Sequence, residues 1–185
     1  MLKDIAEIIA FIQNNSVPLF ESDNSGTVAF FDDKGFNFSE LASVKYKELC
    51  DFPHLYIAFT RNKKGFYYVG KSYQRGGRWK KQHAYHLGTL AYHLLNNIRG
   101  DDQNHFHWIE SWMDPESKKT TRLPYSITLK ERVYITFIPF LIYSEANTNI
   151  LSKPEIRDIN SQAEKTVINY YKIKGFTLLN VHHNR

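Results

Sequence analysis

The sequence has a single cysteine, Cys50, and no long hydrophobic run. One thiol cannot form an internal disulfide, and no Cys/His spacing is typical of a zinc site. No stretch approaches the roughly 20 consecutive apolar residues of a membrane span. The N-terminal segment carries Asp4 and Glu7 where a signal peptide would be apolar. These absences predict a soluble, cytoplasmic protein with no membrane partner.

The composition is that of a globular chain. With 185 residues it is long enough for one domain with a sizeable core, but too short for two full domains. Hydrophobic residues make up 42% and aromatic residues 15%, which excludes a disordered chain. The 24 Lys and Arg against 19 Asp and Glu give a net charge of +5, a basic excess that is compatible with a polyanionic partner.

The first 53 residues have the pattern of a separate section. Apolar residues recur at helical spacing until Asn14 and Pro18 end the pattern. A short strand and a second helix from Ser39 to about Cys50 follow. Residues 1–53 are therefore expected to form an N-terminal extension of helix, short strand and helix.

Three β-rich segments follow. "HLYIAFT" and "GFYYVGKS" predict strands at about 54–60 and 65–71, joined by a hairpin loop, and "ERVYITFIPFLIY" predicts a buried strand. Residues 146–162 are interpreted as a polar connector, and apolar spacing predicts a helix at 163–174. Residues 85–130 mix turn formers and aromatics, which indicates a large insertion.

The order of the motifs resembles the GIY-YIG nuclease superfamily. The resemblance covers roughly residues 54–84 and 131–182 and is carried by the tyrosine of "HLYIAF", the "YVG" of "FYYVGKS", an arginine ten residues later, the glutamate of "AEKTVINYY" and the asparagine of "LLN". It implies an α+β fold with a small central three-stranded, mainly antiparallel sheet flanked by helices. This catalytic domain would span residues 54–185 and carry the insertion at about 85–130.

Phosphodiester cleavage requires groups of the types that these motifs supply. A water must lose a proton, the growing charge on the phosphorane must be stabilised, and the leaving oxygen must be neutralised. The resemblance implies that Tyr56 orients or deprotonates the water. A phenol with a pKa near 10 is a poor base at neutral pH, so it needs a neighbouring cation such as Lys71. The alternative is that Tyr56 only packs on a half-buried strand.

The second tyrosine motif contains Tyr68 and Gly70. Strand alternation places Tyr67 and Tyr68 on opposite faces. The resemblance favours Tyr68 for the site, because counting from it puts Gly70 and Lys71 at the positions of the motif. The resemblance implies that Gly70 lets the substrate approach the backbone closely. Lys71 is expected at the end of the strand, where it can turn toward the same phosphate as Tyr68.

The basic segment that follows supplies the phosphate clamp. Arg78 matches the family arginine, with Arg75 as a competitor because "RGGR" offers two candidates. His83 matches the histidine that ends this motif, but it stands five residues after Arg78, and the usual spacing of four falls on Gln82. An ordinary solvated helix face is the alternative for this cluster. The residues expected to contact DNA are Gly70, Arg75, Lys80 and Lys81.

Glu164 is the expected metal ligand. It is the sole carboxylate in the predicted helix 163–174, and the resemblance implies one Mg²⁺ per active site, which Mn²⁺ can replace. The alternative is a first-turn glutamate that complements the helix dipole. The resemblance implies that Asn180 braces the active site, and a plain turn residue is the alternative.

A nuclease core with an extension and an insertion is arranged like the small type II restriction endonucleases of this family. We therefore expect metal-dependent, sequence-specific cleavage of double-stranded DNA by a homodimer on a palindromic site, with a cognate DNA methyltransferase as partner. A nicking or structure-specific nuclease of repair or mobile elements is one alternative. A catalytically inactive DNA-binding module is the other.

Overall fold

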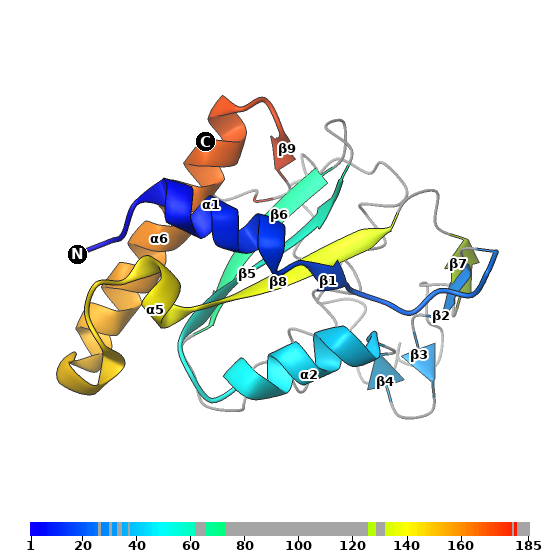
Figure 1. Ribbon diagram of the computed structural model, residues 1–185, viewed down its shortest axis with the longest axis horizontal. Coiled ribbons are helices and arrows are strands. Elements are labelled where there is room, and N and C mark those ends of the chain that lie inside the picture. The colour runs from blue at the N-terminus through cyan, green and yellow to red at the C-terminus, as the bar shows by residue number, and fades with distance from the viewer. Residues whose placement is uncertain are drawn as a thin grey trace, which may run out of the picture.

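The computed structural model describes residues 1–25, 27–29, 31–32, 35–36, 38–61, 66–72, 126–128, 132–178 and 180. Within these residues the fold is α+β, with helices packed on both faces of one five-stranded sheet (Figure 1). The strands of this sheet lie in the order β1 (Val17–Pro18), β8 (Val133–Pro139), β5 (His54–Thr60), β6 (Phe66–Ser72) and β9 (Thr177–Leu178).

The α+β class is confirmed, but the prediction of a three-stranded sheet is wrong. The three predicted strands form its antiparallel centre, where β5 pairs with both β6 and β8. β1 adds an antiparallel partner to β8, and β9 adds a parallel partner to β6. These two added strands have two residues each, which is too short to show a periodicity in the sequence.

The helices cover the sheet unequally. α2 (Glu40–Leu49) packs on one face, and α1 (Ile5–Asn14), α5 (Phe140–Tyr143) and α6 (Lys153–Ile173) pack on the other. Each face has its own buried cluster, and every residue of β5 is buried between them. The register therefore decides which side chains of β5 and β6 can meet.

The N-terminal residues belong to this core. α1 buries Ile8, Ile9 and Ile12 against the sheet, and β1 extends the sheet at its edge. Two small sheets lie beyond it: β2 (Thr27–Ala29) pairs with β7 (Ser126–Thr128), and β3 (Phe31–Asp32) pairs with β4 (Gly35–Phe36). β7 falls within the expected insertion, so a part of that segment pairs with the N-terminal section.

α6 begins ten residues earlier than the predicted helix at 163–174. Ser152 caps it: the Ser152 Oγ accepts the Glu155 N–H, and the Glu155 carboxylate accepts the Ser152 N–H at 2.8 Å. Pro154 lies in the first turn, where its missing N–H costs no hydrogen bond. The segment interpreted as a polar connector is therefore largely helical. No helix among the described residues is both long and apolar enough to cross a bilayer.

Candidate active site

The residues singled out on β5 and β6 divide between the two faces of the sheet. Tyr56 lies opposite Gly70, and Lys71 lies opposite Leu55. Facing residues of an antiparallel pair point to the same side, and neighbours along a strand point to opposite sides. Tyr56 therefore shares the α2 face with Gly70 and Tyr68, whereas Lys71 points to the α6 face.

Tyr56 and Gly70 fit closely together. Tyr56 is 2% exposed, and a Cβ added at Gly70 would overlap its Cζ and Oη atoms. The ring of Tyr68 lies beside that of Tyr56, with 6.1 Å between the centroids. The tyrosine ring thus occupies the space that any larger residue 70 would need. A DNA contact at Gly70 stays a prediction.

Lys71 and Glu164 form an ion pair between β6 and α6. The Lys71 Nζ donates to Glu164 Oε2 at 2.7 Å and to Ser161 Oγ at 3.1 Å. The side chains are 22% and 8% exposed, so water reaches the lysine more than the carboxylate. Lys71 lies inside β6, which ends at Ser72, and so it does not turn toward the face of Tyr68 as expected from a strand end.

Glu164 occupies a different place in its helix from the one predicted. Because α6 also contains Glu155 and Asp158, Glu164 is not the sole acid of the helix. It lies in the middle of α6, so it does not complement the dipole at a first turn. Of the acids whose burial the structure describes, it alone is buried. A carboxylate buried in a helix interior and held by a lysine is typical of a functional or structural ion pair.

Glu164 is also the residue on which the expected Mg²⁺ depends. The part of the chain that the structure describes contains no group of three His, Cys, Asp or Glu side chains suited to a metal. One carboxylate is sufficient for Mg²⁺ when water and a substrate phosphate complete the shell. The Lys71 ammonium already binds Oε2, so it would compete with a metal ion for that oxygen.

Asn180 binds the backbone of β6. Its Oδ1 accepts the Val69 N–H at 3.0 Å, and its Nδ2 donates to the Val69 carbonyl at 2.6 Å. The amide thus continues the parallel pairing that β9 makes with Phe66 and Tyr67. Val69 lies between Tyr68 and Gly70, so Asn180 fixes the part of the strand that carries the second tyrosine motif.

A buried hydrogen-bond chain, which is not among the sequence-based predictions, lies one helical turn before Glu164. Asn160 is fully buried; its Oδ1 accepts the Tyr143 hydroxyl at 2.6 Å, and its Nδ2 donates to the Ser72 carbonyl at 3.2 Å. Burial raises the pKa of Tyr143 well above its ordinary value, which keeps the phenol a donor. Asn160 thereby joins α6 to the residue after Lys71. The sequence signal for this role is the polar Asn160 four positions before Glu164, but it lies in the segment interpreted as a polar connector.

His54 is a second buried polar residue near this end of the sheet. Its Nδ1 lies 2.8 Å from the Phe52 carbonyl, which can only accept, so Nδ1 carries the proton. Burial lowers the pKa of His54 against the opposing effect of the Phe52 and Leu49 carbonyls, and its Nε2 has no hydrogen-bond partner among the described residues. The imidazole packs edge-on against Phe137, with 6.1 Å between the rings. His54 is thus held neutral by its surroundings.

The basic segment lies outside the described residues. It contains the expected phosphate clamp and its neighbours, namely Arg75, Arg78, Lys80, Lys81, Gln82 and His83. Their roles remain predictions. The described part of the candidate site consists of Tyr56, Tyr68, Gly70, Lys71, Glu164 and Asn180.

Comparison with known proteins gives no match: no protein-family model, curated protein or solved structure is significantly similar to the chain.

Proposed function

We propose that the chain is a metal-dependent DNA endonuclease that hydrolyses phosphodiester bonds. One observation carries the proposal: side chains from three distant parts of the sequence meet around four consecutive residues of β6, Tyr68 to Lys71. Tyr56 lies over Gly70, Asn180 binds Val69, and Glu164 binds Lys71. These are residues to which the resemblance to the GIY-YIG nucleases assigns a role.

The chemistry follows from the kinds of group on each side of β6. On the α2 face, Tyr56 is the group that orients or deprotonates the attacking water. On the α6 face, Lys71 supplies positive charge for a phosphate, and the Glu164 carboxylate holds that ammonium in place. Because Gly70 has no side chain, only its backbone separates the Tyr56 phenol on one face of β6 from the other face, to which Lys71 points. A phosphate at the edge of β6 would then lie between a phenol and an ammonium.

Mg²⁺ is the metal that suits this donor set. Glu164 would hold it together with water and the substrate phosphate, and when bound it would stabilise the charge of the leaving oxygen. Binding of the phosphate to Lys71 would weaken the hold of the ammonium on Glu164. The same lysine that neutralises the carboxylate in the free protein would then neutralise the substrate.

A type II restriction enzyme is the form of this activity that we favour. The resemblance supports cleavage of double-stranded DNA at a specific sequence by a homodimer, with a companion methyltransferase that protects the host DNA. A nicking or structure-specific nuclease is the alternative within the enzymes. An inactive DNA-binding module is also a candidate, because the Lys71 ammonium occupies an oxygen of the only proposed metal ligand.

Cleavage of supercoiled plasmid with and without Mg²⁺ separates these functions. A restriction enzyme produces discrete linear fragments, a nicking enzyme produces open circles, and a binding module produces neither while still retarding the DNA in a gel. Absence of metal-dependent cleavage on any plasmid or phage DNA would refute the nuclease proposal.

A further inference from the structure

An open groove of about 640 Å³ lies beside the C-terminal end of α6. α1, the end of β5 and the C-terminal end of α6 form its walls, and its lining includes Phe59, Arg61, Tyr170, Lys174 and Phe176. Its volume is in the range of ordinary ligand sites. None of the described candidate active-site residues lines it, so it is a separate feature of the molecule.

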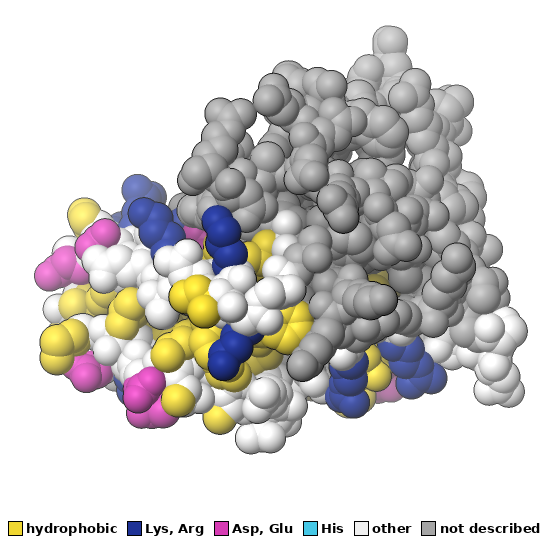
Figure 2. Space-filling view, turned by 90° about the horizontal axis from the view of Figure 1, so that it is seen from above, with side chains coloured by type: hydrophobic (Ala, Val, Ile, Leu, Met, Phe, Trp, Pro, Cys, Tyr) yellow, Lys and Arg dark blue, Asp and Glu magenta, His cyan; other side chains and the backbone are white. Residues whose placement is uncertain are grey.

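The charge of this groove is positive. Arg61 and Lys174 line it, no described acid does so, and neither cation forms a salt bridge with a carboxylate of the described residues. After Glu164, α6 carries Lys165 and Lys172 and no acid, and its C-cap residue is Lys174. In Figure 2, which looks down on the upper side of Figure 1, Lys and Arg side chains lie among hydrophobic ones, and most Asp and Glu lie toward the margin.

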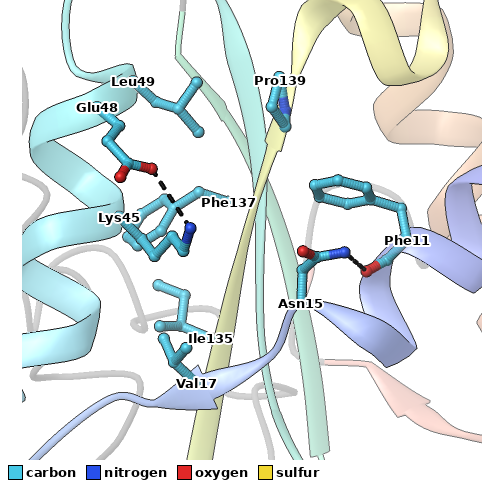
Figure 3. Close-up of a pocket in the computed structure, with 9 residues that line it drawn as sticks. All are labelled: Phe11, Asn15, Val17, Lys45, Glu48, Leu49, Ile135, Phe137 and Pro139. Atoms are coloured by element: carbon cyan, nitrogen blue, oxygen red, sulfur yellow. Dashed lines mark hydrogen bonds and ion pairs between the residues drawn. The ribbon is translucent and has the colours of Figure 1, made fainter.

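A second hollow of the described residues provides a contrast. It is small, about 90 Å³, and lies between α1, α2 and β8 (Figure 3). The cation that lines it, Lys45, forms a salt bridge with Glu48 of the same helix, with 3.4 Å between Lys45 Nζ and Glu48 Oε2. That hollow therefore presents no net charge to a ligand, whereas the groove at α6 does.

Aromatic rings hold the two cations of the groove. The Arg61 guanidinium lies 4.2 Å from the ring centroid of Tyr134, and the Lys174 ammonium lies 5.9 Å from that of Tyr170. Tyr134 in turn stacks on Phe59, with 6.0 Å between centroids. A ring positions a cation without neutralising it, so both charges remain available to an external anion.

The floor of the groove is also aromatic. Tyr171 packs edge-on against both Tyr170 and Phe176, with 5.4 Å between the centroids of each pair. Tyr171 is buried, whereas Tyr170 and Phe176 are partly exposed. Partly exposed rings beside cations are the combination with which proteins bind unpaired nucleotides: a base stacks on a ring, and the phosphate meets the cation.

We propose that this groove binds an unpaired nucleotide of DNA, with the base against Tyr170 and Phe176 and its phosphates at Arg61 and Lys174. The inference rests on the proposed function in taking DNA as the ligand. It adds an unpaired segment, of the kind that a nick or a single-stranded tail supplies, to the duplex that is cut. Lys174, the C-cap of α6, comes ten positions after Glu164, which is about 15 Å along the helix axis at 1.5 Å per residue. The groove would thus hold a single-stranded segment at a distance from the Lys71–Glu164 pair.

Fluorescence anisotropy in EDTA tests this, because binding is then measured without cleavage. The probes are a labelled oligothymidylate and a blunt duplex of the same length. We expect Tyr170→Leu to weaken oligothymidylate binding about five-fold or more, the lower range for loss of a stacked base. Lys174→Gln should weaken it and reduce its salt dependence, because a phosphate contact is lost. Tyr170→Phe, which keeps the ring, and Lys165→Gln, a lysine of α6 outside the groove, should bind as the wild type does.

Wild-type affinity of Tyr170→Leu for oligothymidylate would overturn the proposal. An equal loss of affinity for the blunt duplex would also overturn it, because it would indicate a general attraction to phosphates. Circular dichroism and the thermal midpoint verify the fold of each variant. A chain that cuts no DNA but shows this pattern would refute the nuclease proposal and leave the groove as a nucleotide site.

Discussion

Tyr56 and Gly70 face each other across β5 and β6, and the tyrosine ring lies where a side chain at position 70 would be. The pair explains why the second motif contains a glycine in the middle of a strand, where glycine is ordinarily unfavourable. Gly70 is needed to leave room for the Tyr56 ring, independently of any contact with a substrate. Its role can therefore be tested by stability alone.

Gly70→Ala should lower the free energy of unfolding by about 1–3 kcal/mol, the cost of forcing an extra carbon into a packed site. Urea denaturation measures this cost. The matched comparison is the same substitution in a Tyr56→Ala background, where the ring is gone and the new methyl group has room. Additive effects of the two substitutions would show that the ring and the glycine do not interact.

Tyr56→Phe removes one hydroxyl and keeps the packed ring. If the phenol orients or deprotonates the attacking water, cleavage should slow by about 100-fold or more, as for the loss of a general acid or base. DNA affinity should change little. Single-turnover cleavage beside binding measurements tests both points, with Tyr68→Phe for comparison. Full activity would leave Tyr56 as a packing residue of the strand.

Asn180→Asp separates the two hydrogen bonds that this side chain makes with Val69. The carboxylate can still accept the Val69 N–H, but it cannot donate to the carbonyl and would face that oxygen with a negative charge. The free energy of unfolding should fall by about 1–3 kcal/mol. Denaturation by urea is the measurement, and an unchanged midpoint would contradict the brace.

The centre of the sheet was predictable because β5, β6 and β8 are runs of β-branched and aromatic residues. The start of α6 was missed because its apolar positions are widely spaced among polar ones. Its signal was the capping pair Ser152 and Glu155, three residues apart, which is the pattern of a helix N-terminus. Asn160 was hidden by the same error.

The face of Lys71 was missed for a different reason. A strand predicted at 65–71 makes Lys71 its last residue, free to turn either way, whereas the observed β6 continues to Ser72. Pairing with Leu55 then directs Lys71 to the α6 face. A shift of one residue in a strand end reverses the interpretation of a side chain, because alternation has a period of two.

His54 should make stability depend on pH. Burial lowers its pKa in the folded state, so the unfolded chain, with an ordinary value near 6.5, takes up the proton first. Its contribution is fully present above that value and is lost as pH falls through 6.5 toward the folded pKa. Unfolding free energies measured from about pH 8 to 5 should therefore decline, and the decline should be shallower in His54→Gln. Parallel curves for the two proteins would contradict this assignment.

The Lys71–Glu164 pair is the centre of the proposed site, and Glu164→Gln tests it most directly. The substitution keeps the size and an acceptor for Lys71 but removes the charge that would hold Mg²⁺. The measurement is single-turnover cleavage of a mapped phage DNA in Mg²⁺ at matched DNA occupancy, with Asp158→Asn as the control on the same helix. We predict that the wild type and Asp158→Asn release discrete fragments with a common end sequence. Glu164→Gln should bind DNA equally well, but its cleavage rate should fall by about 100-fold or more. Cleavage by Glu164→Gln at the wild-type rate would contradict the account.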